Sequence, residues 1–141
     1  MNVLFDTCIV IDALQSRQPF AGQAQTLFLL AATHRINGFL TAKACTDIYY
    51  LTHHYTHDEQ QSRQVVDKLF SLFTVLDTAA DDLTRALPSK MPDFEDALMV
   101  ETALRSGVDA VVTRNLDDYR QAAITVYAPG ELIALINNEE E

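Results

Sequence analysis

Three carboxylates lie within four residues at the start of a predicted helix, where Asp93, Glu95 and Asp96 follow Pro92. Asp93 is placed as the helix N-cap, and Asp96, three residues later, lies on the same helix face. If this otherwise apolar helix packs on a sheet, one carboxylate must look inward, toward a cation. We expect Asp96 to be that group, ionised with the help of the helix dipole, and Glu95 to point to solvent.

Further acids follow the two clearest predicted strands, residues 2–5 and 110–113. Asp6 comes directly after the first strand, and Asp118 lies in the loop that leaves the second. Parallel strands present their carboxyl ends at one edge of a sheet, where ligands bind. Asp47, in the helix after a short strand, is placed to join them. The sequence therefore predicts that carboxylates from distant segments converge.

Four converging carboxylates repel one another and require protonation or a cation. Oxygen ligands without nearby histidine or cysteine favour Mg²⁺ or Mn²⁺, and such ions support metal-assisted phosphodiester hydrolysis. Each acid also has an ordinary interpretation when it is read singly: Asp6 and Asp93 as caps, Asp96 as a partner of the helix dipole, Asp47 on a solvated face, and Asp118 in a turn.

Other reactive side chains give weaker patterns. His53 and His57 have the spacing of a zinc peptidase helix, but His54 stands where that motif carries glutamate, which favours surface or stacking histidines. Cys8 and Cys45 are far apart and belong to no metal-binding pair, so they are expected to be small buried thiols.

The composition restricts the classes of partner. The chain has 141 residues and a formal net charge of −10, so contact with nucleic acid would have to be local rather than spread over a basic surface. We predict one domain over residues 1–136 and a frayed acidic tail over residues 137–141. The sequence has no membrane-length apolar stretch and no secretory pattern at its start, so we expect a cytoplasmic protein without a membrane partner.

Alternating elements must position the acids. The predicted strands are residues 2–5, 39–41, 74–77, 110–113 and 124–127, and the predicted helices are residues 8–14, 22–35, 42–54, 59–73, 79–87, 94–106 and a last one from 129. Asn37 and Gly38 are expected to end the second helix. This order predicts an α/β fold with three layers, in which helices cover both faces of a mainly parallel sheet of four to five strands.

Three motifs resemble the PIN domain family, the fold of many prokaryotic toxin ribonucleases of the VapC type. They are the opening residues 6–12 (DTCIVID), the acidic residues 93–98 (DFEDAL) and the closing residues 112–119 (VTRNLDDY). The resemblance implies that Asp6, Asp96 and Asp118 are core acids of a metal site, with Asp47 in the place of a common Glu or Asp. It also implies roles in the outer shell or at the substrate for Thr7, Asp93, Thr113, Arg114 and Asn115.

The resemblance implies an endoribonuclease that uses Mg²⁺ or Mn²⁺, acts as the toxin of a toxin–antitoxin pair, forms a homodimer and binds a small antitoxin protein. Two alternatives stay open. Asp47 is shorter than the usual Glu, which is compatible with a catalytically weak module for RNA binding or regulation. The run Asp6-Thr7-Cys8 is similar to phosphatases with an aspartyl nucleophile, although their second Asp is replaced here by Cys8, and this gives a small-molecule phosphohydrolase as the other alternative.

Overall fold

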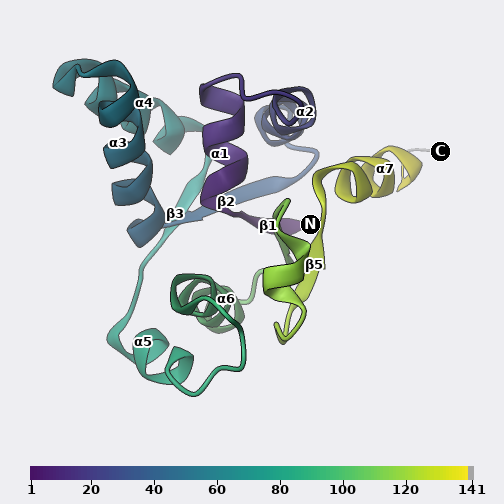
Figure 1. Cartoon of the computed structure of the whole chain (residues 1–141). Coiled ribbons are helices and arrows are strands. Elements are labelled where there is room, and N and C mark those ends of the chain that lie inside the picture. The colour runs from purple at the N-terminus through teal and green to yellow at the C-terminus, as the bar shows by residue number, and fades with distance from the viewer. Residues whose placement is uncertain (140–141) are drawn as a thin grey trace.

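The computed structural model describes residues 1–139 and contains one five-stranded parallel sheet (Figure 1). The strands are β1 (Asn2–Phe5), β2 (Asn37–Thr41), β3 (Thr74–Leu76), β4 (Ala110–Val112) and β5 (Thr125–Tyr127). Their order across the sheet is β3-β2-β1-β4-β5, and every neighbouring pair is parallel. The predicted α/β fold is therefore confirmed, with a sheet that is parallel throughout.

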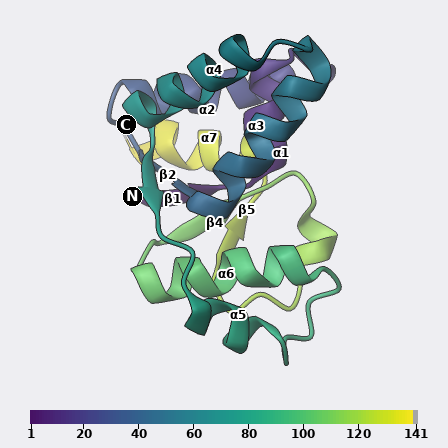
Figure 2. The same cartoon turned by 90° about the vertical axis from the view of Figure 1, so that its left-hand side faces the viewer.

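Helices cover both faces of the sheet. They are α1 (Thr7–Leu14), α2 (Ala21–Ala32), α3 (Ala42–Thr56), α4 (Glu59–Leu72), α5 (Ala80–Ala86), α6 (Phe94–Ser106) and α7 (Pro129–Glu139), and a short 3₁₀ helix η1 spans Leu116–Tyr119. Figure 2 shows α1 to α4 with α7 on one side and α5 with α6 on the other. The three predicted layers are thus present.

The alternation of side chains along β1 builds both halves of the core. Val3 and Phe5 face the layer that contains α1, and Leu4 faces α6, and none of the three is exposed to solvent. Successive side chains of a strand point to opposite faces, so a strand covered on both sides reads as a continuous apolar run. This buried strand fixes the position of the residue that follows it.

The boundary predicted at Asn37 and Gly38 is wrong. The second helix ends earlier, at Ala32, and Asn37 and Gly38 are the first residues of β2, paired with β1. Phe73 explains the glycine, because a Cβ on Gly38 would lie 2.7 Å from its ring. Gly38 is therefore kept for close packing in a strand rather than for a helix stop.

The boundaries of α6 agree with the sequence. The Asp93 carboxylate accepts a hydrogen bond from the Asp96 backbone N–H at 2.9 Å, and Gly107 ends the helix with a φ of 73°. At the other end of the chain, α7 continues to Glu139, so part of the predicted tail is helical, and residues 140–141 lie outside the described residues. None of the helices within residues 1–139 has the length and apolar character needed to cross a membrane.

Candidate active site

The strand order reverses between β1 and β4, and Asp6 and Thr113 lie side by side at the carboxyl edge of that point. The Asp6 backbone N–H donates to the carbonyl of Val112 at 3.0 Å, and the Thr113 N–H donates to the carbonyl of Tyr127 at 3.0 Å. These bonds extend the backbone hydrogen bonding between the strands by one residue. The side chains of Asp6 and Thr113 therefore project from the rigid edge of the sheet. This is the switch point at which open parallel sheets bind ligands.

The Asp6 carboxylate is held by neutral donors. It is 6% exposed, accepts a hydrogen bond from the Thr113 hydroxyl at 2.7 Å and lies 3.5 Å from the Cys8 thiol. Although Asp6 occupies the N-cap position of α1, its side chain makes no capping hydrogen bond. The prediction that Asp6 is the N-cap residue is confirmed for its position, but its carboxylate lines the cavity instead of capping the helix.

Cys8 is a neutral donor beside this carboxylate. Burial and the charge of Asp6 raise the pKa of the Cys8 thiol to about 12. The second cysteine, Cys45, is buried and also free. The prediction of small buried thiols is confirmed for Cys45, whereas Cys8 is only partly buried.

Asp96 enters the site from the first turn of α6. Its carboxylate accepts a hydrogen bond from the Tyr119 hydroxyl at 3.2 Å. Burial, followed by the charges of Asp6 and Asp93, raises the pKa of Asp96 to about 7, and Asp118 contributes in the same direction. Burial and the neighbouring carboxylates thus oppose the helix dipole, which favours the ionised form of Asp96.

A cavity of about 280 Å³ opens at this edge of the sheet. Its lining combines four carboxylates, Asp6, Asp47, Glu95 and Asp96, with Lys43, the hydroxyl side chains Thr7, Thr41, Thr78 and Thr102, and Ala44, Tyr50, Leu51, Leu98 and Met99. Of the four carboxylates that were predicted to converge, Asp6, Asp47 and Asp96 line this cavity, together with Thr7.

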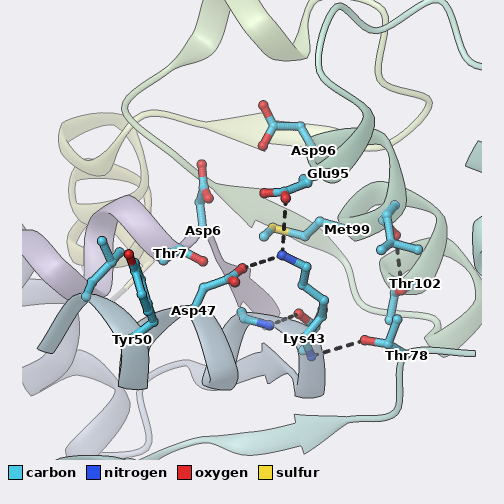
Figure 3. A pocket seen from close by; sticks show the side chains of 14 residues that line it. Asp6, Thr7, Lys43, Asp47, Tyr50, Thr78, Glu95, Asp96, Met99 and Thr102 are labelled. Carbon is cyan, nitrogen blue, oxygen red and sulfur yellow. Dashed lines mark hydrogen bonds and ion pairs between the residues drawn. The ribbon is translucent and has the colours of Figure 1, made fainter. Parts of the chain in front are cut away.

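Lys43 lines this cavity and lies between Asp47 and Glu95, as Figure 3 shows. Its ammonium lies 2.7 Å from the Asp47 carboxylate and 3.3 Å from that of Glu95. Burial is the largest single influence and lowers the pKa of Lys43, but the hydrogen bonds and charges of Asp47 and Glu95 together outweigh it, so this pKa lies above its ordinary value. The Glu95 side chain is 70% exposed, as predicted, and it also pairs with Lys43 at the edge of the cavity lining.

Asp118 lies beside the cavity rather than in its lining. It borders a neighbouring hollow together with Arg114, Asn115, Leu116 and Asp117. The Asn115 backbone N–H donates to the Thr113 hydroxyl at 3.1 Å, which ties this loop to the donor that holds Asp6. Asp118 therefore acts on Asp96 through its charge, and Asn115 acts on the site through its backbone.

Arg114 is committed to an internal ion pair. Its guanidinium donates to the carboxylate of Asp12, which is fully buried, at 2.7 and 3.3 Å, and lies 4.3 Å from the centre of the Phe20 ring. A role in binding a substrate phosphate would require this pair to break. The alternative of an ion pair is the one that the structure contains, with one partner in the core rather than on the surface.

The histidines of α3 stack on tyrosines. The ring of His53 lies 6.0 Å from that of Tyr49 and nearly parallel to it, and His54 stacks on Tyr50 at 6.4 Å. Residues 1–139 contain no group of three or more His, Cys, Asp or Glu side chains close enough to share one metal ion. The interpretation of these histidines as stacking residues is confirmed.

The donor set nevertheless fits a hydrated divalent cation. Mg²⁺ binds through one or two carboxylates and keeps several waters, so it needs no dense cluster of ligands. Asp6 and Asp96 face one cavity, and burial together with the charge of Asp6 raises the pKa of Asp96 to about 7. These two carboxylates could hold the ion, with Asp118 at the edge.

Sequence reasoning missed three polar partners. The sequence indicates the ion pair of Lys43, because Lys43 precedes Asp47 by four residues on one helix. The sequence also points to Tyr119, because it carries a hydroxyl at the end of the closing motif, directly after Asp118. Asp12 was visible as a charged residue in an otherwise apolar helix, but the sequence could not supply its partner.

Comparisons with known proteins agree with this description. The family model described as "PIN domain" matches residues 2–117. A search of curated proteins found no match. Among solved structures, a toxin–antitoxin complex from Klebsiella pneumoniae has a TM-score of 0.65 and 22% identity, covering 90% of this chain and 97% of that one.

Two further structures share the fold. VapBC-1 from nontypeable Haemophilus influenzae has a TM-score of 0.69 and 11% identity and covers 92% of this chain and 99% of its own. VapC20 from Mycobacterium tuberculosis, described as a toxin that cleaves the sarcin–ricin loop, has a TM-score of 0.61 and 14% identity, with 77% and 86% covered. With the matched family model, these observations show that the chain belongs to the PIN domain family.

Proposed function

We propose that this protein is a ribonuclease that depends on Mg²⁺ or Mn²⁺ and hydrolyses phosphodiester bonds of RNA. The observation that carries the proposal is the cavity at the switch point, which Asp6 and Asp96 enter from β1 and α6. Membership of the PIN domain family and the RNA-cleaving activity named for one structural neighbour support it. A bound ion would activate water and stabilise charge on the phosphate.

Each residue has a distinct task in this proposal. Asp6 and Asp96 would hold the ion, and the carboxylate of Asp118 adds a negative charge at the edge of the site. The Thr113 hydroxyl orients Asp6, and Asp93 fixes the first turn of α6 by capping it. No side chain is required as a nucleophile, because water attacks the phosphorus.

We propose that the biological setting is a toxin–antitoxin pair. The support comes from neighbours whose solved structures are toxin–antitoxin complexes. A small antitoxin protein would then cover the acidic cleft, and the toxin would act as a homodimer. A cytoplasmic location is part of the same proposal.

The decisive experiment uses Asp96→Asn. Wild-type protein should cleave members of a pool of structured RNAs in Mn²⁺, and chelator should stop cleavage. Asp96→Asn should lower the rate at least about 100-fold, because it removes a charged ligand while the fold persists. Asp67→Asn, an exposed change in α4, is the control. Unchanged cleavage by Asp96→Asn, with folding verified by circular dichroism, would contradict the proposed site.

A second candidate is a catalytically weak module that binds RNA. The observation that favours it is the ion pair between Asp47 and Lys43, which leaves that acid engaged. Such a module would bind an RNA from the pool with the same affinity in Mn²⁺ and in chelator and would leave it intact. Metal-dependent cleavage by the wild type excludes it.

A further inference from the structure

We propose that Lys43 is a built-in cation of the acidic cleft: it engages Asp47 and Glu95 and thereby limits the cleft to one divalent metal ion. The proposal rests on the metal-dependent function proposed above. It assigns Asp47 to Lys43 instead of to the metal, which revises the set of four acids expected from the sequence.

The geometry places Lys43 between two layers of the fold. Asp47 lies on α3, four residues after Lys43, whereas Glu95 lies on α6, on the opposite side of the sheet. The ammonium therefore lies between the two carboxylates, 2.7 Å from that of Asp47 and 3.3 Å from that of Glu95. In Figure 3 the two carboxylates approach it from different sides.

The base of this side chain is fixed as well. The Lys43 backbone N–H donates to the Thr78 hydroxyl at 3.2 Å, and α3 is capped two residues earlier by Thr41, whose hydroxyl accepts from the Ala44 N–H at 3.0 Å. The side chain of Lys43 is about one-third exposed, at 35%. An ammonium fixed in this way is part of the cavity wall rather than a free surface charge.

Charge counting shows what the ammonium does. Among the described residues that line the cavity, four are carboxylates, and Lys43 is the one lysine or arginine. One divalent ion added to Lys43 gives three positive charges against four negative ones. A second divalent ion would raise the number of positive charges to five, and it would lie against the ammonium beside Asp47, where like charges repel strongly.

Asp6 and Asp96 are the two lining carboxylates that remain to bind the single divalent ion. Thr113 donates to Asp6 and Tyr119 donates to Asp96, so within residues 1–139 the hydroxyl donors that hold these two carboxylates are neutral. Mg²⁺ and Mn²⁺ can bind through two carboxylates and waters. The cleft therefore has one position for a metal ion, at Asp6 and Asp96, and a permanent positive charge at the Lys43 ammonium.

The test counts Mn²⁺ ions by isothermal titration calorimetry and by electron paramagnetic resonance of free Mn²⁺. Wild-type protein should bind one ion. Lys43→Met keeps the length of the side chain without its charge and should bind a second ion, because Asp47 and Glu95 are released. Lys68→Met, at an exposed position of α4, should bind one ion like the wild type. Lys43→Gln serves as a second neutral variant if Lys43→Met does not fold.

The double variant Lys43→Met/Asp47→Asn completes the design, since removal of the released acid should return the count to one. Two ions in the wild type, or one ion in both neutral variants, would overturn the role of Lys43 and leave the proposed ribonuclease intact. Absence of Mn²⁺ binding by the wild type would instead overturn the metal-dependent function itself.

Discussion

At the scale of single residues, the notable feature of Asp6 is the kind of donor that holds it. A structural carboxylate is commonly neutralised by a basic side chain, as Asp12 is by Arg114. Asp6 is instead held by a hydroxyl and a thiol, which orient a carboxylate without cancelling its charge. Its negative charge therefore stays available to a cation in the cavity.

Thr113→Val tests this orientation. Valine keeps the shape of threonine but removes the donor 2.7 Å from Asp6, and a hydrogen bond to a charged group contributes roughly 1.5–3 kcal/mol. We expect kcat/KM for RNA cleavage to fall about 10- to 100-fold. Thr125→Val, at an exposed position of β5, should leave it unchanged. If Thr113→Val kept full activity, the hydroxyl would have no part in positioning Asp6.

The raised pKa of Asp96 makes the metal-free protein sensitive to pH. The folded-state pKa of about 7 exceeds the value of 3.8 in an unfolded chain, so the folded state binds the proton more tightly. The free energy of unfolding should therefore fall as pH rises from about 4 to about 7 and then level off. Because Asp96 is half-buried, we expect its share to be roughly 1–2 kcal/mol.

Urea unfolding in chelator at pH 5 and pH 8 measures this effect. Wild-type protein should lose stability between the two values, and Asp96→Asn should lose less, because its amide does not titrate. Asp67→Asn should behave like the wild type. Equal losses in wild type and Asp96→Asn would show that Asp96 is not protonated in the folded state near neutral pH.

At the scale of elements, α6 is anchored by a buried acid of α5. The Asp82 carboxylate is fully buried and accepts hydrogen bonds from Thr102 at 3.0 Å and from Arg105 at 2.8 and 3.0 Å, both on α6. It also accepts from Arg85 at 2.6 Å and from the Ala79 N–H at 2.9 Å. This network fixes α6 and hence the position of Asp96.

Acid should weaken this anchor. The hydrogen bond from Arg105 lowers the pKa of Asp82 from 3.8 to about 2, so its contribution is complete above about pH 4 and is lost as pH falls toward 2. The shift corresponds to about 2 kcal/mol. Asp82→Asn should lower the free energy of unfolding at pH 7 by at least that amount and flatten its acid dependence. Chemical denaturation from pH 2 to 7 measures both, and an unchanged profile would contradict the anchor.

The same elements show what a sequence can and cannot predict. The boundaries of α6 follow from Asp93 and Gly107, since caps are local patterns. Gly38 was assigned wrongly because its packing partner, Phe73, lies far away in the chain. Contacts across the fold, such as that between Lys43 and Glu95, depend on the packing of two layers, which no spacing in the sequence records.

At the scale of the whole molecule, charge and fold act in opposite directions on an RNA substrate. The chain carries 20 acidic residues and 10 basic ones, which repel a polyanion at long range. The described arginines are largely paired with acids, as Arg114 and Arg105 are. We propose that residues 1–136 act as one domain that binds RNA through the cleft alone.

The salt dependence of cleavage tests this picture. A protein that neutralises many phosphates loses affinity steeply with salt, by about 10³- to 10⁵-fold between 50 and 200 mM for six to ten contacts. Here we expect KM for a short single-stranded RNA to change less than about threefold over that range at constant Mn²⁺, because screening also weakens the repulsion from the acidic surface. Initial rates at several salt concentrations measure KM, with the circular dichroism spectrum as a control for folding. A steep rise in KM would reveal a basic binding surface outside the cleft and would contradict recognition confined to the switch point.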